Sequence, residues 1–154
     1  MTHEVDVQVA CKEDDLPDPP KLRAWAIAAL GEQREDSELT IRIVDEAEIE
    51  QLNNDYRHKT GATNVLSFPF DAPPGVKLPL LGDIIICAPV VRREASEQSK
   101  SVTSHWAHMV VHGALHLLGF NHEQDDEAQK MEAMEARILA DFGFANPYQP
   151  RGTS

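Results

Sequence analysis

The segment HGALHLLGFNH, residues 112–122, carries three histidines in a pattern that fits a metal site. His112 and His116 are four residues apart, so on an α-helix they share one face, about 6 Å apart along the axis. Their imidazoles can then bind one metal ion at about 2.1 Å from each nitrogen. Gly119 can adopt the left-handed conformation that ends a helix, and the resulting turn would bring in His122. We therefore predict a site with three protein ligands and a fourth position for water, as in catalytic zinc sites.

Two other interpretations of these histidines are weaker. His108 also precedes His112 by four residues, but His108 and His116 would lie about 12 Å apart along the helix, too far to share an ion. We expect His108 to contact substrate, to orient a ligand, or to be an ordinary buried, hydrogen-bonded histidine. A histidine cluster without metal is disfavoured because the pair, the glycine and the third histidine occur together.

The residue after His112 argues against a protease. Zinc proteases of the H-E-x-x-H type place a glutamate there as general base, whereas this chain has Gly113. Glycine cannot accept a proton, so the protease interpretation lacks its base. Asp83, a carboxylate in an apolar stretch, is a weak candidate for the base. It can equally be a partner of a ligand or a strand residue without a catalytic role, so the base stays unassigned.

Charge and composition restrict the class of protein. The 154 residues include 26 acidic and 14 basic side chains, which give a net charge of −12. This charge opposes indiscriminate binding to nucleic acid, although it allows a local basic site. Cys11 and Cys87 lack CxxC partners and are expected to be reduced thiols. The N-terminus lacks signal-peptide features, and prolines and Asp83 interrupt the longest apolar region. We expect a soluble cytoplasmic protein that does not enter a membrane.

Hydrophobic periodicity predicts strands and helices along the whole chain. Asp45 and Glu48 have the spacing of a capping box at the start of the second helix, and Thr103 or Ser104 is expected to cap the histidine helix. The predicted strands are Val5–Val9, Glu38–Val44, Asn64–Phe70 and Leu80–Cys87. The predicted helices are Lys21–Leu30, Asp45–Tyr56, Pro89–Lys100, the histidine helix, and a last helix that begins at Asp125.

This order predicts an α+β fold, with a small mixed β-sheet of about four strands packed against helices. The metal-binding helix is expected to be central, as in zincin-like folds. We expect one domain over residues 1–145, followed by a loose tail over residues 146–154.

Three segments resemble the YbeY family of bacterial endoribonucleases, which act as rRNA maturation factors. Residues 112–122 are similar to that family's motif H-G-x-L-H-L-x-G-[YF]-D-H. Residues 56–59, YRHK, and 63–69, TNVLSFP, are similar to its Y-R-x-K and T-N-V-L-S-F-P. Residues 81–84, LGDI, match its L-G-D-I strand. The segments occur in the family's order, and the resemblance covers residues 35–142.

The resemblance implies a zinc-dependent endoribonuclease that prefers single strands and acts in 16S rRNA 3′-end maturation and ribosome quality control. It implies one zinc ion per chain, bound by His112, His116 and His122, and partners in ribosomal RNA and in the small ribosomal subunit with its proteins. Arg57 matches the arginine implicated in activity. Asn121 stands where the family has aspartate; it keeps a carbonyl acceptor but loses the charge.

The residues allow a chemistry consistent with this resemblance. A zinc ion lowers the pKa of its water to about 7 and stabilises phosphodiester charge. Arg57 can bind phosphate oxygens with its guanidinium group, and Lys59 can add a second cation, although both can also be solvated loop residues. The alternative function is a non-catalytic ribosome assembly factor with a structural metal. The acidic chain fits that alternative because ribosomal proteins are often basic.

Overall fold

The computed structural model describes residues 3–13, 15–31, 36–71, 73–76, 78–120 and 124–148. Helices and strands follow the predicted order, and the predicted α+β fold is confirmed. The strands are β1 (His3–Ala10), β2 (Ser37–Val44), β3 (Val65–Pro69) and β4 (Leu80–Cys87). The helices are α1 (Pro19–Leu30), α2 (Glu46–Arg57), α3 (Ala88–Glu97), α4 (Val102–Leu117) and α5 (Asp125–Asp141).

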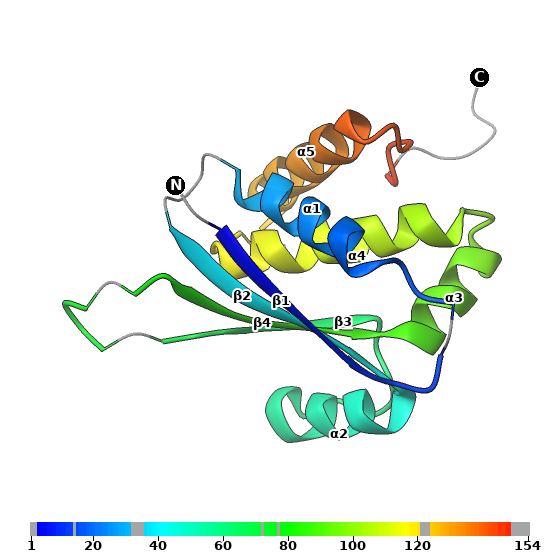
Figure 1. Cartoon of the computed structure of the whole chain (residues 1–154), viewed down its shortest axis with the longest axis horizontal. Coiled ribbons are helices and arrows are strands. Elements are labelled where there is room, and N and C mark those ends of the chain that lie inside the picture. The colour runs from blue at the N-terminus through cyan, green and yellow to red at the C-terminus, as the bar shows by residue number, and fades with distance from the viewer. Residues whose placement is uncertain are drawn as a thin grey trace.

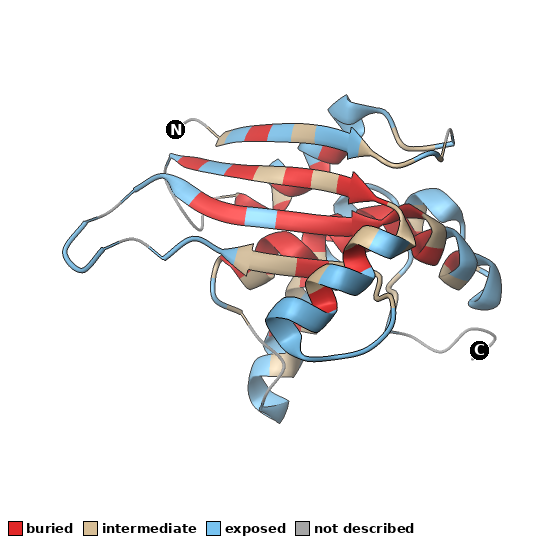
Figure 2. Cartoon of the chain, turned by 90° about the horizontal axis from the view of Figure 1, so that it is seen from below, coloured by how far each residue is buried: buried red, intermediate tan, exposed pale blue. Residues whose placement is uncertain are grey.

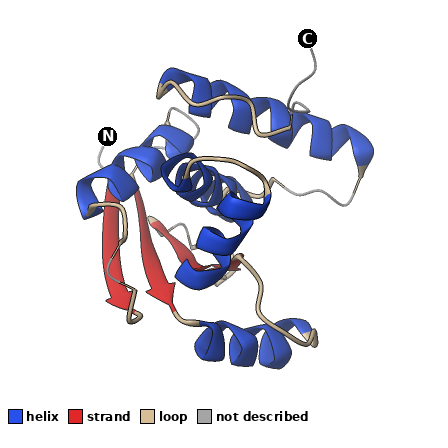
Figure 3. Cartoon of the chain, turned by 90° about the vertical axis from the view of Figure 1, so that its right-hand side faces the viewer, coloured by secondary structure: helices blue, strands red, loops and turns tan. Residues whose placement is uncertain are grey.

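The four strands form one mixed sheet in the order β1-β2-β4-β3. The pairs β1–β2 and β2–β4 are parallel, whereas β3 runs antiparallel to β4 and forms one edge of the sheet. Helices α1, α4 and α5 lie over one face of this sheet, and α2 lies on the opposite side (Figures 1 and 3). The edge strand β3 therefore lies next to the helices on both sides of the sheet, and it contributes residues to the candidate site.

The apolar run in β4 is buried on both faces, as its sequence predicts. Ile84 and Ile86 belong to the larger core cluster between the sheet and α1, α4 and α5. Ile85 and Cys87 belong to a smaller cluster that includes Ile49 of α2. Among the strands, Figure 2 shows the buried residues concentrated in the two central ones. Two hydrophobic layers thus fix β4 in position, and β4 in turn supports α4.

Helix α4 lies very close to the sheet at Gly113. A β-carbon added at this position would lie 2.7 Å from Cγ2 of Ile84, closer than carbon atoms pack. Helix α4, which carries the histidines, also packs against α1, α3 and α5, so it lies at the centre of the fold. The glutamate of a zinc protease has no room at this position without a shift of Ile84.

The predicted capping box at α2 is wrong because both side chains have other partners. The Asp45 carboxylate precedes the helix but accepts a hydrogen bond from the Lys12 backbone amide at 3.2 Å. Glu48 pairs with Arg42 of β2, with 2.7 Å between Oε2 and Nε. These carboxylates do not cap the helix. They link α2 and the residue before it to β2 and to the backbone of Lys12.

The helix boundaries near the site also differ from the prediction. Arg57, expected in a loop, is the last residue of α2. Ser101 caps α4 in place of the predicted Thr103 or Ser104, since its hydroxyl accepts a hydrogen bond from the Ser104 amide at 3.1 Å. Ser101 and Ser104 have the N-cap-to-N3 spacing, so the cap lies two residues before Thr103 and three before Ser104.

Other expectations concern the thiols, the membrane and the tail. No disulfide joins Cys11 to Cys87, and burial raises the pKa of the Cys87 thiol to about 11. Within the described ranges, no helix combines the length and apolar character that crossing a membrane requires. The tail expected to be loose from residue 146 is anchored at Tyr148, whose hydroxyl bonds Glu135. Residues 149–154 lie outside the described part of the chain.

Candidate active site

His112 and His116 lie on consecutive turns of α4 with their rings close together. Their Nε2 atoms are 3.1 Å apart, and both side chains are half-buried. Two nitrogen ligands on one tetrahedral zinc ion are about 3.4 Å apart when each bond is about 2.1 Å. The pair can therefore bind one ion after a small adjustment. The predicted third ligand, His122, and its neighbour Asn121 lie outside the described residues.

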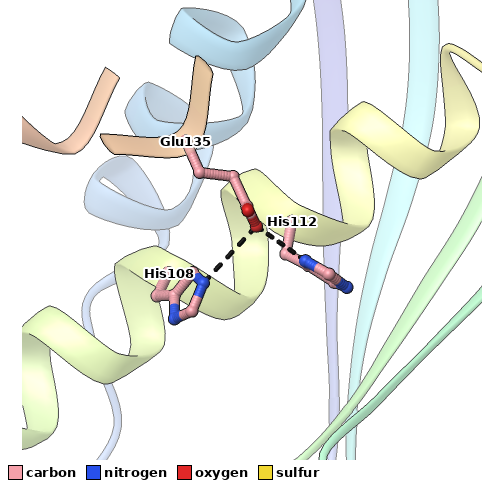
Figure 4. A group of neighbouring side chains, drawn as sticks. All are labelled: His108, His112 and Glu135. Carbon is pink, nitrogen blue, oxygen red and sulfur yellow. Dashed lines mark hydrogen bonds and ion pairs between the residues drawn. The ribbon is translucent and has the colours of Figure 1, made fainter. Parts of the chain in front are cut away.

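A buried carboxylate holds His112 from the other side of its ring. Glu135 of α5 has no exposed surface. Its Oε1 atom lies 2.6 Å from Nδ1 of His112, and its Oε2 atom accepts a 2.5 Å hydrogen bond from the Tyr148 hydroxyl. Nε2 of His108 lies 3.4 Å from Oε1 and 3.1 Å from the Tyr148 hydroxyl. Figure 4 shows His108 and His112 pointing toward Glu135.

These contacts keep Glu135 ionised. Burial alone would raise the pKa of Glu135, but the hydrogen bonds from His108, His112 and Tyr148, together with charge attraction from His112, outweigh burial and lower that pKa to about 2. Burial and the bond to Glu135 raise the pKa of Tyr148, which keeps its hydroxyl a donor. A carboxylate that accepts at Nδ1 selects the tautomer of His112 with its proton on that atom. Nε2 of His112 is then a lone-pair donor directed toward His116.

His108, His112 and Glu135 also form a candidate metal site of their own. Their ligand atoms all lie within 4.8 Å of one another. The 2.6 Å separation between His112 and Glu135 has the length of a charge-assisted hydrogen bond. Two candidate ion positions therefore share His112: one at Nδ1, beside the buried carboxylate, and one at Nε2, beside His116.

A groove of about 590 Å³ lies beside the histidine pair. His112 and His116 line it from α4, and Tyr56 and Arg57 line it from the end of α2. The rest of the wall is residues 63–69, which include the whole of β3. The Ser67 hydroxyl donates a hydrogen bond to the Gly113 carbonyl at 3.2 Å and so ties the edge strand to α4. The groove brings two nitrogen ligands and a guanidinium group to one opening.

The other residues singled out by sequence lie away from this groove. Lys59 is exposed beyond the end of α2 and is not among the lining residues. Asp83 is exposed on β4 and also does not line the groove. Because neighbouring strand residues face opposite sides, Asp83 points away from Ile84 and from α4. His108 contacts Glu135 and Tyr148, which matches its alternative interpretation as a buried, hydrogen-bonded histidine.

Sequence reasoning missed Glu135 and Tyr148. A signal existed for Glu135, because it lies four residues after Met131 and four before Leu139, on the buried stripe of α5. A carboxylate on an apolar helix face has to find a partner inside the protein. Tyr148 follows α5 without a periodic pattern, so only the three-dimensional fold reveals its contact.

Comparisons with known proteins agree with this architecture. The family model described as Endoribonuclease YbeY matches residues 9–143. The solution structure of TM1509 from Thermotoga maritima is similar, with a TM-score of 0.58 and 21% sequence identity. The similarity covers 94% of this chain and 99% of that chain. At this identity, the structural likeness supports the fold alone.

Proposed function

The chain belongs to the YbeY family of endoribonucleases, metal-dependent hydrolases of phosphodiester bonds, and on that premise we propose that it cleaves single-stranded ribosomal RNA in this groove. The observation that carries the proposal is that His112 and His116, whose Nε2 atoms are 3.1 Å apart, line the same groove as Arg57. A metal-binding pair and a phosphate-binding cation at one opening suit a phosphodiester substrate.

We propose zinc as the metal, one ion per chain, with His112, His116 and His122 as its ligands. Imidazole nitrogens are common zinc ligands, and three of them leave an open coordination position. Bound zinc supplies a Lewis acid for the phosphodiester and lowers the pKa of its water to about 7. Within the chain, Glu135 orients His112 by accepting at Nδ1, and Tyr148 holds Glu135 in place.

Arg57 takes the role of phosphate ligand in this proposal. It is exposed at the end of α2 and lines the same groove as the two histidines. A guanidinium group donates two parallel hydrogen bonds to the oxygens of one phosphate, which fixes its orientation as well as its charge. Lys59 and His108 do not line the groove, so the proposal assigns neither to substrate binding.

The cellular role proposed is 16S rRNA 3′-end maturation and ribosome quality control in the cytoplasm. It would be carried out by one catalytic domain over residues 1–145. A net charge of −12 suits contacts with basic proteins of the small ribosomal subunit. The same charge also favours the second candidate, a non-catalytic assembly factor whose metal stabilises the fold.

Removal of the metal tests both candidates. We expect the purified protein, freed of contaminating ribonucleases, to cleave single-stranded RNA, to stop when zinc is chelated, and to recover when zinc returns. A duplex of the same sequence should be cleaved more slowly. Circular dichroism during chelation reports the fold. An unfolded chelated protein that never cleaved RNA would support the assembly factor instead.

Glu135→Gln tests the orienting carboxylate. The substitution keeps the shape and removes the charge, so we expect zinc affinity to fall about 10- to 100-fold, as for other partners of metal-bound histidines. Competition with a chromophoric chelator measures the change. Glu127→Gln, at an exposed position in the first turn of the same helix, is the matched control. Unchanged zinc affinity in Glu135→Gln would refute the orienting role.

A further inference from the structure

An exposed aromatic residue lines the groove. Tyr56, in the last turn of α2, is 67% exposed. Its ring packs against Phe68 of β3, with 5.3 Å between ring centroids and 69° between planes. Both rings line the groove that contains His112 and His116. An edge-to-face contact holds the tyrosine in one orientation, and its high exposure leaves ring surface open to a ligand.

The groove has little positive charge, and for this reason the aromatic ring of Tyr56 matters for RNA binding. Among the described residues that line the groove, Arg57 is the one lysine or arginine. The chain as a whole carries a net charge of −12. Proteins that hold single strands through many phosphate contacts carry basic grooves. With one cation among the described lining residues and a net charge of −12, general electrostatic attraction is weak, so a single-stranded RNA needs a second source of affinity close to Arg57.

We propose that Tyr56, supported by Phe68, is a stacking platform for one unpaired base of the RNA substrate, beside the phosphate bound by Arg57. This inference rests on the proposed function of the groove. Stacking on an aromatic side chain contributes about 5- to 150-fold in affinity per base and accepts any base, because every base has a π-face. A base inside a duplex is already stacked on both sides, so the platform also selects single strands.

The neighbouring positions of Tyr56 and Arg57 support this pairing of roles. Consecutive helix residues point about 100° apart, so one turn of α2 can present a ring and a guanidinium group to different parts of one nucleotide. Phe68 lies on the edge strand that forms the groove wall. The two rings therefore join α2 and β3. The RNA strand would enter the groove between these two elements.

Binding of a short single-stranded RNA that contains 2-aminopurine tests the platform. Stopped-flow mixing records binding before cleavage proceeds. With zinc-loaded protein, we expect fluorescence quenching by the unsubstituted chain and by Tyr56→Phe. Tyr56→Ala should bind about 5- to 150-fold more weakly, with a correspondingly higher KM and a much smaller change in kcat. The dependence of log Kd on log salt should be shallow, with a magnitude near 0.7 to 1.4 for one or two phosphate contacts.

Two comparisons keep the outcome decisive. Phe142→Ala removes another exposed aromatic, 39% exposed at the end of α5, and should bind RNA like the unsubstituted chain. RNA with a single abasic position, tried along the strand, should lose affinity at one position with the unsubstituted protein, a test that needs no variant. Equal binding by Tyr56→Ala, or equally weak binding by Tyr56→Phe and Tyr56→Ala, would overturn stacking. If the unsubstituted chain cleaves RNA in that case, the proposed function stands and the platform alone fails.

Discussion

His116→Ala is expected to abolish zinc binding at the groove and to lower RNA cleavage by about a thousandfold or more. Nε2 of His116 lies 3.1 Å from Nε2 of His112, and alanine leaves one described nitrogen ligand on this side. Loss of the metal removes several kcal/mol of transition-state stabilisation. The fold should persist because His116 is half-buried and its helix is anchored by many apolar contacts. Metal analysis, RNA cleavage and thermal unfolding measure the three consequences.

The control and the decisive comparison use other histidines. His3→Ala, on β1 and hydrogen-bonded to the Gly31 carbonyl, should keep both zinc and cleavage. The two candidate ion positions predict opposite results. If zinc lies beside the buried carboxylate, His108→Ala removes it and His116→Ala does not. Zinc-loaded, fully active His116→Ala would therefore refute the groove as the metal position. We also expect His116→Ala to melt at the temperature of the chelated unsubstituted protein.

The fold was largely predictable from sequence because its elements carry strong local signals. Alternating apolar residues mark β1 and β2, and the run Ile84–Ile86 marks a strand buried on both faces. The capping details were not predictable in the same way. Asp45 and Glu48 have the spacing of a capping box, but Lys12 and Arg42 compete for them from distant parts of the chain. A local pattern cannot register such long-range partners.

The candidate site also has one part that local sequence predicts and another part that depends on long-range packing. The spacing of His112 and His116 on one helix face is a local property, and the structure places their Nε2 atoms together. The meeting of Arg57 with these histidines depends on how α2, β3 and α4 pack, and here family resemblance supplied the residue. Glu135 approaches His112 from 23 residues away in the chain, through the packing of α5 on α4, and Tyr148 in turn contacts Glu135 and His108. Asp83, which the sequence left open between a base, a partner of a ligand and a strand residue, is exposed on β4 and does not line the groove.

Arg57→Glu is expected to lower kcat/KM for RNA cleavage by about 10²- to 10³-fold while zinc content stays the same. Removing one positioned donor from a developing charge costs about this much, and a carboxylate at this position also repels the phosphate. Arg57 is exposed at the end of α2, so the free energy of unfolding should change by no more than about 0.5 kcal/mol. Cleavage kinetics, metal analysis and thermal unfolding on the same sample measure these three quantities.

A charge-matched control separates a local contact from a general change of field. Arg137→Glu, at an exposed position on α5, makes the chain equally more negative and should leave kcat/KM nearly unchanged. Arg57→Lys should fall between the two, because a lysine keeps the charge but loses the two parallel donors. Equal losses in Arg57→Glu and Arg137→Glu would show that net charge limits RNA association, and Arg57 would then have no particular role. Loss in Arg57→Glu alone, with zinc retained, would establish that the metal site and phosphate contact are separable parts of one groove.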